Sequence, residues 1–264
     1  MKKISFILII SFLFFSLSSC IPSIGINDRL LISAIGIDYE NNKYNLTMEY
    51  ININSQDEQG EKEIISSTGD TIIDGLKNAE KKYGKSLFYS HNKIIIIGDS
   101  IITDKIKSIK PLFTGNYATR ANTEIFYFSQ KAANLIINKK YDLNLLPDIT
   151  QANGNKCTLL DLVNSLNDDY FSILIPQIKI DENNCTVDTS VLTDGVKQKI
   201  ISKENTQSVN LLKGKISKNN FLIEVDNNKI SVDVKDIKEK IEYDGENFII
   251  KINGQSSLNE KSFN

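Results

Sequence analysis

Residues 93–98 read Lys93-Ile94-Ile95-Ile96-Ile97-Gly98, and this run decides how the surrounding chain folds. Its consecutive isoleucines are apolar and β-branched, which favours a strand over a helix. Because no polar residue interrupts them, both faces of that strand need cover from other parts of the chain. We therefore expect 93–98 to be a central, buried strand of a sheet.

Two more strands are expected on the N-terminal side of this run. Leu30 to Asp38 is an apolar stretch with a Gly and an Asp near its end, which is typical of a buried strand. Between residues 44 and 50, apolar and polar side chains alternate, so we expect a strand with one buried face. Glu40-Asn41-Asn42 would join the two as a hairpin. Residues 57–63 are expected to form a charged loop.

Helical periodicity begins near Asp70, a suitable N-cap, and is expected to end at Gly84. The apolar residues on one face of this helix are Ile72, Leu76, Ala79 and Tyr83. Further helix-like segments lie at 101–110, 129–138 and 158–166. The last of them starts with a variant of the capping box, formed by Thr158 and Asp161. A short strand at 173–176 should end at its proline.

The pattern changes at Val191, after which helical periodicity is absent and short β segments alternate with turns. The turns expected there are Asp194-Gly195, Asp226-Asn227-Asn228 and Asp244-Gly245-Glu246. The fold class is therefore predicted to be α+β. A mixed α/β N-terminal domain at 29–190 would precede a β-rich region that starts at residue 191.

Composition and charge narrow the class of protein. The chain has 264 residues, 41% of them hydrophobic and 24% charged, which are ordinary values for a globular protein. Its formal net charge is −2, and it becomes −4 if residues 1–19 are removed, because they carry two lysines and no acid. A mildly acidic chain without a basic block is a poor partner for nucleic acid.

The first twenty residues have the organisation of an export signal. Lys2 and Lys3 precede an apolar run from Ile4 to Leu17, which is shorter than the roughly 20 residues of a membrane-spanning helix. The ending Leu17-Ser18-Ser19-Cys20 is a lipobox. In such a signal residues 1–19 are removed, and Cys20 carries a diacylglyceryl group that holds the protein on the outer face of a membrane. The alternatives are an ordinary secretory signal with a chance cysteine, or a short buried helix.

Two cysteines remain, Cys157 and Cys185, and an exported pair of this kind could form a disulfide. Their spacing does not decide whether it does. Metal binding is not expected, because one histidine and no Cys-x-x-Cys motif supply poor ligands.

No catalytic constellation is evident, so no cofactor is expected. Residues 79–86 fit a relaxed phosphate-loop pattern, but the helix precedes the strand and the loop is not rich in glycine, so we treat the match as chance. His91, the single histidine, could act as a general base, although a hydrogen-bonded loop residue is the simpler interpretation. The pairs Asp168-Asp169 and Asp181-Glu182 are interpreted as solvated turns.

In the order of its motifs the chain resembles the Ger(x)C lipoproteins, the C subunits of GerA-type spore germinant receptors. The most specific block is Leu87-Phe88-Tyr89-Ser90-His91-Asn92 together with the isoleucine run that follows it. The other matching stretches are the lipobox, Leu31-Ile32-Ser33-Ala34-Ile35-Gly36-Ile37-Asp38, Gly69-Asp70-Thr71, Thr158-Leu159-Leu160, Ile175-Pro176 and Ser202-Lys203-Glu204-Asn205-Thr206.

Two features depart from the family pattern. Members usually carry Trp-Asp after the lipidated cysteine, whereas Ile21-Pro22 follows Cys20 here. Members also continue into a third domain, and this chain stops near its expected first strand. The resemblance thus implies a lipidated tether at 20–28, a β-rich middle region at 191–225 and the incomplete start of a third α+β domain at 226–264.

The resemblance implies a non-enzymatic receptor subunit on the outer face of the spore inner membrane, anchored through Cys20. Its partners would be a receptor A subunit and an integral-membrane B subunit. One alternative is a solute-binding lipoprotein of a transport system, which needs two α/β lobes around a cleft. Another is a surface hydrolase, whose activity would depend on His91.

Overall fold

The computed structural model describes residues 25, 28–52, 61–115, 119–181, 185–225 and 228–261. The expected leader at 1–19, Cys20 and most of the tether at 20–28 lie outside these residues, as do Asp226 and Asn227 of one expected turn. The elements are β1 (Arg29–Glu40), β2 (Lys43–Asn52), β3 (Glu61–Gly69), α2 (Ile72–Tyr83), β4 (Ser86–Phe88), β5 (Ile94–Gly98), η2 (Ile106–Ile109), α3 (Lys110–Thr114), β6 (Glu124–Phe128), α4 (Ala132–Asn138), η3 (Leu143–Leu145), α5 (Leu146–Ala152), α6 (Leu159–Leu166), β7 (Ile173–Ile180), β8 (Cys185–Thr193), β9 (Gln198–Ile201), α7 (Lys203–Leu212), β10 (Lys218–Val225), β11 (Asn228–Tyr243) and β12 (Phe248–Lys261).

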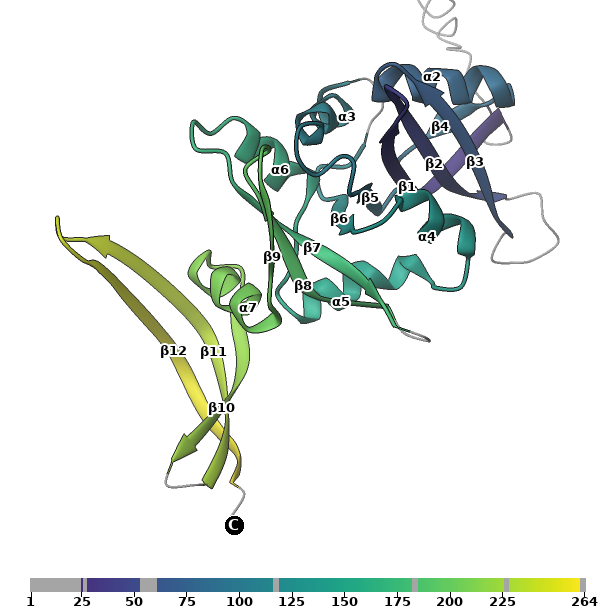
Figure 1. The fold of residues 1–264 in the computed structure, drawn as a ribbon. Helices are drawn as coiled ribbons and strands as arrows, with labels where there is room; N and C mark the ends of the chain where they lie inside the picture. Colours follow the sequence, from purple (N-terminus) through teal and green to yellow (C-terminus); the bar gives the residue numbers. More distant parts are fainter. Residues whose placement is uncertain are drawn as a thin grey trace, which may run out of the picture.

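A nine-stranded mixed sheet organises most of the chain, in the order β3-β2-β1-β5-β6-β7-β8-β9, with β4 paired to β1. Strands β1, β5, β6 and β7 run parallel to one another, and the outer strands β2, β3, β8 and β9 pair antiparallel. A second sheet has the order β10-β11-β12. The fold class is α+β, as predicted (Figure 1).

The large sheet separates two hydrophobic cores. Buried side chains of α2, α3 and α6 pack on one face with Ile95 and Ile97. Those of α4 and α5 pack on the other face with Ile94 and Ile96. Every residue of β5 is buried, so the central position predicted for this strand is confirmed. The alternation of the four isoleucines between the two cores explains why the run contains no polar residue.

The predicted hairpin is also confirmed. Strands β1 and β2 pair antiparallel from Glu40 opposite Lys43 back to Leu31 opposite Ile51. Asn41 and Asn42 connect them with φ angles of 54° and 60°. Asparagine tolerates this left-handed conformation better than most residues, and two such residues in a row form the turn that suits the twist of paired strands.

Strand β3 was not predicted, and the charged loop expected at 57–63 is wrong for Glu61 to Glu63, which begin this strand. β3 lies at the edge of the sheet, where only alternate residues such as Ile65 and Ser67 are buried. A pattern with so few apolar residues carries little strand signal. Residues 57–60 lie outside the part of the chain that the structure describes.

Helix α2 matches the prediction except at its start. Thr71, not Asp70, is the N-cap, because the Thr71 hydroxyl accepts a hydrogen bond from Asp74 N at 3.1 Å. Asp70 lies one residue outside the helix, with a carboxylate 3.9 Å from Lys43 Nζ. Gly84 ends the helix in the left-handed conformation, as expected.

The remaining helix predictions hold in part. The 101–110 segment is a turn followed by η2 and the start of α3, and the 129–138 helix begins only at Ala132. In α6 both hydrogen bonds of the predicted capping box between Thr158 and Asp161 are present. Strand β7 continues past Pro176, contrary to expectation. Pro176 is tolerated because pairing with β6 begins only at Gln177, so no neighbour on that side requires its missing N–H.

Helix α7 contradicts the expectation that no helix follows Val191. Ser202 caps its N-terminus, and the residues that it buries are Thr206 and Asn210. Asn210 Nδ2 donates to Asn155 Oδ1 at 3.1 Å, and Asn155 in turn donates to the carbonyl of Val187 at 3.1 Å. Because this buried face is polar, hydrophobic periodicity could not reveal the helix.

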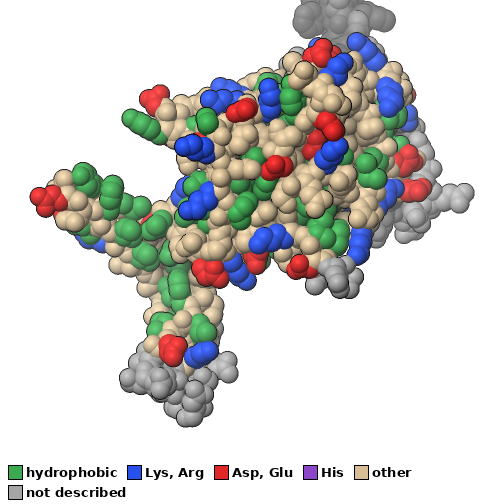
Figure 2. Space-filling view, viewed as in Figure 1, with side chains coloured by type: hydrophobic (Ala, Val, Ile, Leu, Met, Phe, Trp, Pro, Cys, Tyr) green, Lys and Arg blue, Asp and Glu red, His purple; other side chains and the backbone are tan. Residues whose placement is uncertain are grey.

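The boundary predicted between residues 190 and 191 falls inside β8, and the large sheet continues to Ile201. The small sheet begins at Lys218, and its long β11–β12 hairpin projects from the body (Figure 1). Beyond Lys235, β11 pairs with β12 alone. Hydrophobic side chains gather along this arm, with Phe248 74% exposed (Figure 2).

Candidate functional site

The parallel strands of the large sheet end along one line, which we call the carboxyl edge. It consists of residues 38–40 of β1, residues 98–100 after β5, residues 128–130 after β6, and residues 177–181 of β7. In sheets with parallel strands, binding sites commonly form in the crevice outside this end of the strands. The two cavities described below lie along it and share Gln130.

Asp38 anchors the carboxyl edge to the helix layer. Its side chain is buried, and its two oxygens accept hydrogen bonds from Ala132 N at 2.9 Å and Ala133 N at 3.0 Å. These are the first N–H groups of α4, which have no partner within the helix. Asp38 therefore joins the end of β1 to the start of α4 and sets where that helix lies.

Burial raises the pKa of Asp38 above its ordinary value, and the N–H groups of Ala133 and Ala132 oppose that shift. The glycine at the end of β5 leaves room for this carboxylate. A Cβ at Gly98 would overlap Asp38 Oδ1 and lie 3.1 Å from the backbone oxygen of Gln130. Gly98, which ends the isoleucine run, is therefore needed to leave room for the Asp38 carboxylate that binds the start of α4.

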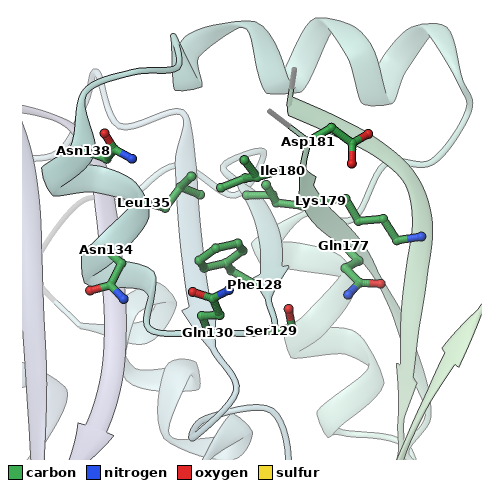
Figure 3. A pocket seen from close by; sticks show the side chains of 11 residues that line it. Phe128, Ser129, Gln130, Asn134, Leu135, Asn138, Gln177, Lys179, Ile180 and Asp181 are labelled. Carbon is green, nitrogen blue, oxygen red and sulfur yellow. The ribbon is translucent and has the colours of Figure 1, made fainter. Parts of the chain in front are cut away.

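The larger cavity at the edge has a volume of about 520 Å³ and lies between α4 and β7 (Figure 3). Phe128 lies between the two walls, with Leu135 of α4 above it. In this view Gln130 lies directly below the Phe128 ring, and Gln177 lies to its right on β7 (Figure 3). The residues that line this cavity are Phe128, Ser129, Gln130, Asn134, Leu135, Asn138, Gln177, Ile178, Lys179, Ile180 and Asp181.

A second cavity of about 320 Å³ lies beside it, at the ends of β1 and β5. Lys131 Nζ forms an ion pair with Glu40 at 2.8 Å across its rim. Asp99, also in its lining, accepts a hydrogen bond from the hydroxyl of Tyr127 at 2.5 Å. Burial and this bond to Asp99 raise the pKa of Tyr127. The charged groups of this cavity are therefore already paired within the protein.

The residues considered for catalysis do not meet at the carboxyl edge. His91 is exposed in the turn before β5, at the opposite end of that strand, and its ring centroid lies 6.1 Å from that of Phe88. It is a loop residue as expected, but its ring makes no hydrogen bond within the described residues. Asp168 and Asp169 are exposed in a turn, and Asp181 is exposed beside Glu182, which lies outside the described residues.

The phosphate-loop match at 79–86 is the end of α2, its Gly84 cap and the start of β4, so the amides of a helix N-terminus are not available there. In the described part of the chain, no three His, Cys, Asp or Glu side chains are grouped so that they could hold a metal ion. No described helix is long and apolar enough to cross a membrane.

The two cysteines are free thiols on opposite faces of the large sheet. Cys157 belongs to the core beneath α6, whereas Cys185 packs against the core beneath α4 and α5. Burial raises the pKa of Cys157 to about 12 and that of Cys185 to about 11. The disulfide that the sequence left open is therefore absent from the structure.

We expect neither thiol to react readily with a disulfide reagent at pH 8 in the folded protein, because the thiolate is the reacting form. Both should react in urea without prior reduction. Since the folded pKa values lie above the ordinary value of 9, the unfolded chain loses these protons first. Stability should thus fall as the pH rises from 9 towards 11. Failure to detect thiols in urea would contradict the conclusion that Cys157 and Cys185 are free.

Sequence reasoning missed the residues that build the larger cavity. Asp38 was recognised as an Asp at the end of a buried strand. Its hydrogen bond from Ala132 N joins residues 94 positions apart, so the sequence did not reveal it. Gln130, Asn134 and Gln177 belong to no motif. Only the pairing of β6 with β7 brings them together.

Comparison with known proteins identifies a family. Residues 23–180 match the family described as "Spore germination protein N-terminal domain". The fold is similar to that in the "Crystal Structure of the GerBC protein", with 18% sequence identity, a TM-score of 0.49, and coverage of 87% of this chain and 73% of that one. No curated protein matches. Because the matched domain spans more than half of the 264 residues, from β1 to the end of β7, the chain belongs to the Ger(x)C family of spore germination proteins.

Proposed function

We propose that the protein is the lipid-anchored C subunit of a nutrient germinant receptor and acts there as a structural component rather than as an enzyme. The observation that carries the proposal is the family match over 23–180, which begins three residues after the lipobox cysteine Cys20. Membership of this family supports a role in spore germination. The lipobox leader supports a location on the outer face of a membrane.

Lipidation at Cys20 would hold the body close to the membrane. The first strand begins at Arg29, so residues 20–28 form the whole connection. Fully extended, they span at most about 30 Å. Each buried methylene of an acyl chain contributes about 0.8 kcal/mol, and two chains give stable anchoring. On this proposal the protein resides on the outer face of the spore inner membrane.

Anchoring also explains how modest docking surfaces could suffice for assembly. Two proteins confined to one membrane meet at a high effective concentration, so contacts that are weak in solution hold a complex together. We propose a receptor A subunit and an integral-membrane B subunit as these partners.

The direct test is to delete the gene in the spore-forming source organism and to measure dipicolinate release from spores exposed to single nutrients. We expect release to fail for the nutrients of one receptor and to return on complementation. A non-nutrient trigger is the control and should act normally. The amounts of the A and B subunits in spore membranes should fall in the deletion strain.

Normal germination with every nutrient, or unchanged amounts of both other subunits, would contradict the proposal. A defect in nutrient uptake by growing cells, with normal germination, would favour the solute-binding alternative. The described chain does not favour that alternative, because it has one large sheet and a projecting hairpin instead of two α/β lobes.

A further inference from the structure

The cavity between α4 and β7 contains hydrogen-bonding groups that the protein itself does not use. The Gln177 side chain is only 6% exposed, and its Oε1 accepts a hydrogen bond from the Thr189 hydroxyl at 3.2 Å. Its Nε2 has no acceptor within the described residues. In Figure 3 the amide nitrogen of Gln177 lies on the side of Phe128. This nitrogen is open to the cavity and is not sealed from solvent, so water or a bound ligand can accept a hydrogen bond from it.

Four exposed residues contribute further polar side chains to the lining. Gln130 places a carboxamide just below Phe128, and Ser129 contributes a hydroxyl below and to the right of the ring (Figure 3). Asn134 and Asn138 belong to the wall formed by α4. Within the described residues, none of these four side chains makes a hydrogen bond. A carboxamide both donates and accepts, as a hydroxyl does.

The interior of the cavity is uncharged. Its two ionic residues are Lys179 on β7 and Asp181 just after the strand, and their charged ends are directed away from Phe128 (Figure 3). A charged ligand would lose its hydration without gaining an opposite charge, which is unfavourable. A neutral ligand therefore suits the space around Phe128 better than a charged one.

The cavity also has an apolar side, formed by Phe128, Leu135 and Ile178. A fitting ligand combines several hydroxyl groups with an apolar C–H face, and its size must suit about 520 Å³, within the range of small-molecule sites. We propose that this cavity binds a neutral sugar ring, with Gln177 and Gln130 hydrogen-bonded to its hydroxyls and Phe128 against its C–H face. Free monosaccharides and the units of a glycan chain share this chemistry.

This inference goes beyond the receptor role proposed above and does not depend on it. A germination defect in the deletion strain would say nothing about sugar binding. Conversely, loss of sugar binding would leave the family assignment and the anchor unaffected. The two are therefore tested by different readouts.

The test uses the full chain, purified from membranes in a detergent without a sugar headgroup. Binding of D-glucose, N-acetyl-D-glucosamine and its β-1,4-linked disaccharide is measured by saturation-transfer NMR. We expect at least one of them to bind saturably, whereas L-alanine and inorganic phosphate do not. Gln177→Leu should weaken binding about tenfold, the effect of one lost hydrogen bond. Binding of the disaccharide alone would identify a glycan as the source, and binding of a monosaccharide would identify free sugar.

Two further variants keep the test decisive. Gln130→Ala removes an exposed side chain with no hydrogen bond to the described residues, so it should weaken sugar binding without affecting folding. It decides the question if Gln177→Leu does not fold. Asn164→Ala, an exposed amide on α6 away from the cavity, is the matched control and should bind as the unaltered protein does. Absence of sugar binding, or binding that Gln177→Leu and Gln130→Ala leave unchanged, would overturn the proposal.

Discussion

Replacing Gly69 with alanine should abolish the stable fold. Gly69 ends β3, where its backbone lies against the first turn of α2. An added Cβ would overlap Gly75 N, and it would lie 2.7 Å from Gly75 Cα and 2.8 Å from the carbonyl carbon of Asp74. All these atoms belong to the helix backbone, so the clash cannot be relieved by a rotamer change. Helix α2 would have to move.

Such a movement is costly because α2 covers the core with Ile72, Leu76 and Ala79, each at most 2% exposed. Overpacking of a core typically costs about 1–3 kcal/mol, and we expect more than about 3 kcal/mol here because backbone meets backbone. Urea unfolding of the full chain in detergent, followed by circular dichroism, measures the loss of unfolding free energy.

Gly75→Ala is the matched control on the opposite side of the same contact. Its Cβ would lie 2.8 Å from Leu46 Cδ1 and 3.2 Å from Leu46 Cγ, so a side chain and not the helix backbone has to shift. Alanine also favours the helix by about 1 kcal/mol over glycine. We expect a small net change in stability. If Gly75→Ala proved as damaging as Gly69→Ala, or if Gly69→Ala were stable, the packing of β3 against α2 described here would be wrong.

Cys20→Ser should eliminate fatty acylation of the protein completely. A hydroxyl in place of the thiol cannot form the thioether to a diacylglyceryl group, and the signal would not be processed at this position. Incorporation of labelled palmitate in sporulating cells is the readout. It is more decisive than fractionation, because an uncleaved apolar leader could itself hold the chain at the membrane.

The control is Cys185→Ser, which removes a partly buried thiol of the folded body and should retain full labelling. Labelled Cys20→Ser protein would show that acylation occurs elsewhere.

Sequence patterns predicted the elements whose buried residues are apolar and regularly spaced. The isoleucine run of β5 and the stripe of α2 are of this kind, and both were found where expected. Hydrophobic periodicity failed to predict an element whose buried residues are polar. Helix α7 buries Thr206 and Asn210 in a network around Asn155, which no scan for hydrophobic periodicity detects.

The site was predictable to a smaller extent. Asp38 and Gly98 were visible as residues that end apolar strands, but their mutual contact depends on the parallel pairing of β1 with β5. The place of Gln177 in the cavity could not be predicted, because this residue follows a proline that was expected to end its strand. Tertiary pairing brings these groups together, and local sequence does not encode that pairing in a readable form.

The central claim is that the folded part of this spore germination protein is anchored to the membrane through Cys20. Mass spectrometry of the N-terminal peptide, prepared from the protein in spore membranes, measures this directly. We predict a peptide that starts at Cys20 and carries the added mass of a diacylglyceryl group. A peptide that still contains Ser18 and Ser19, or one with an unmodified Cys20, would contradict the account.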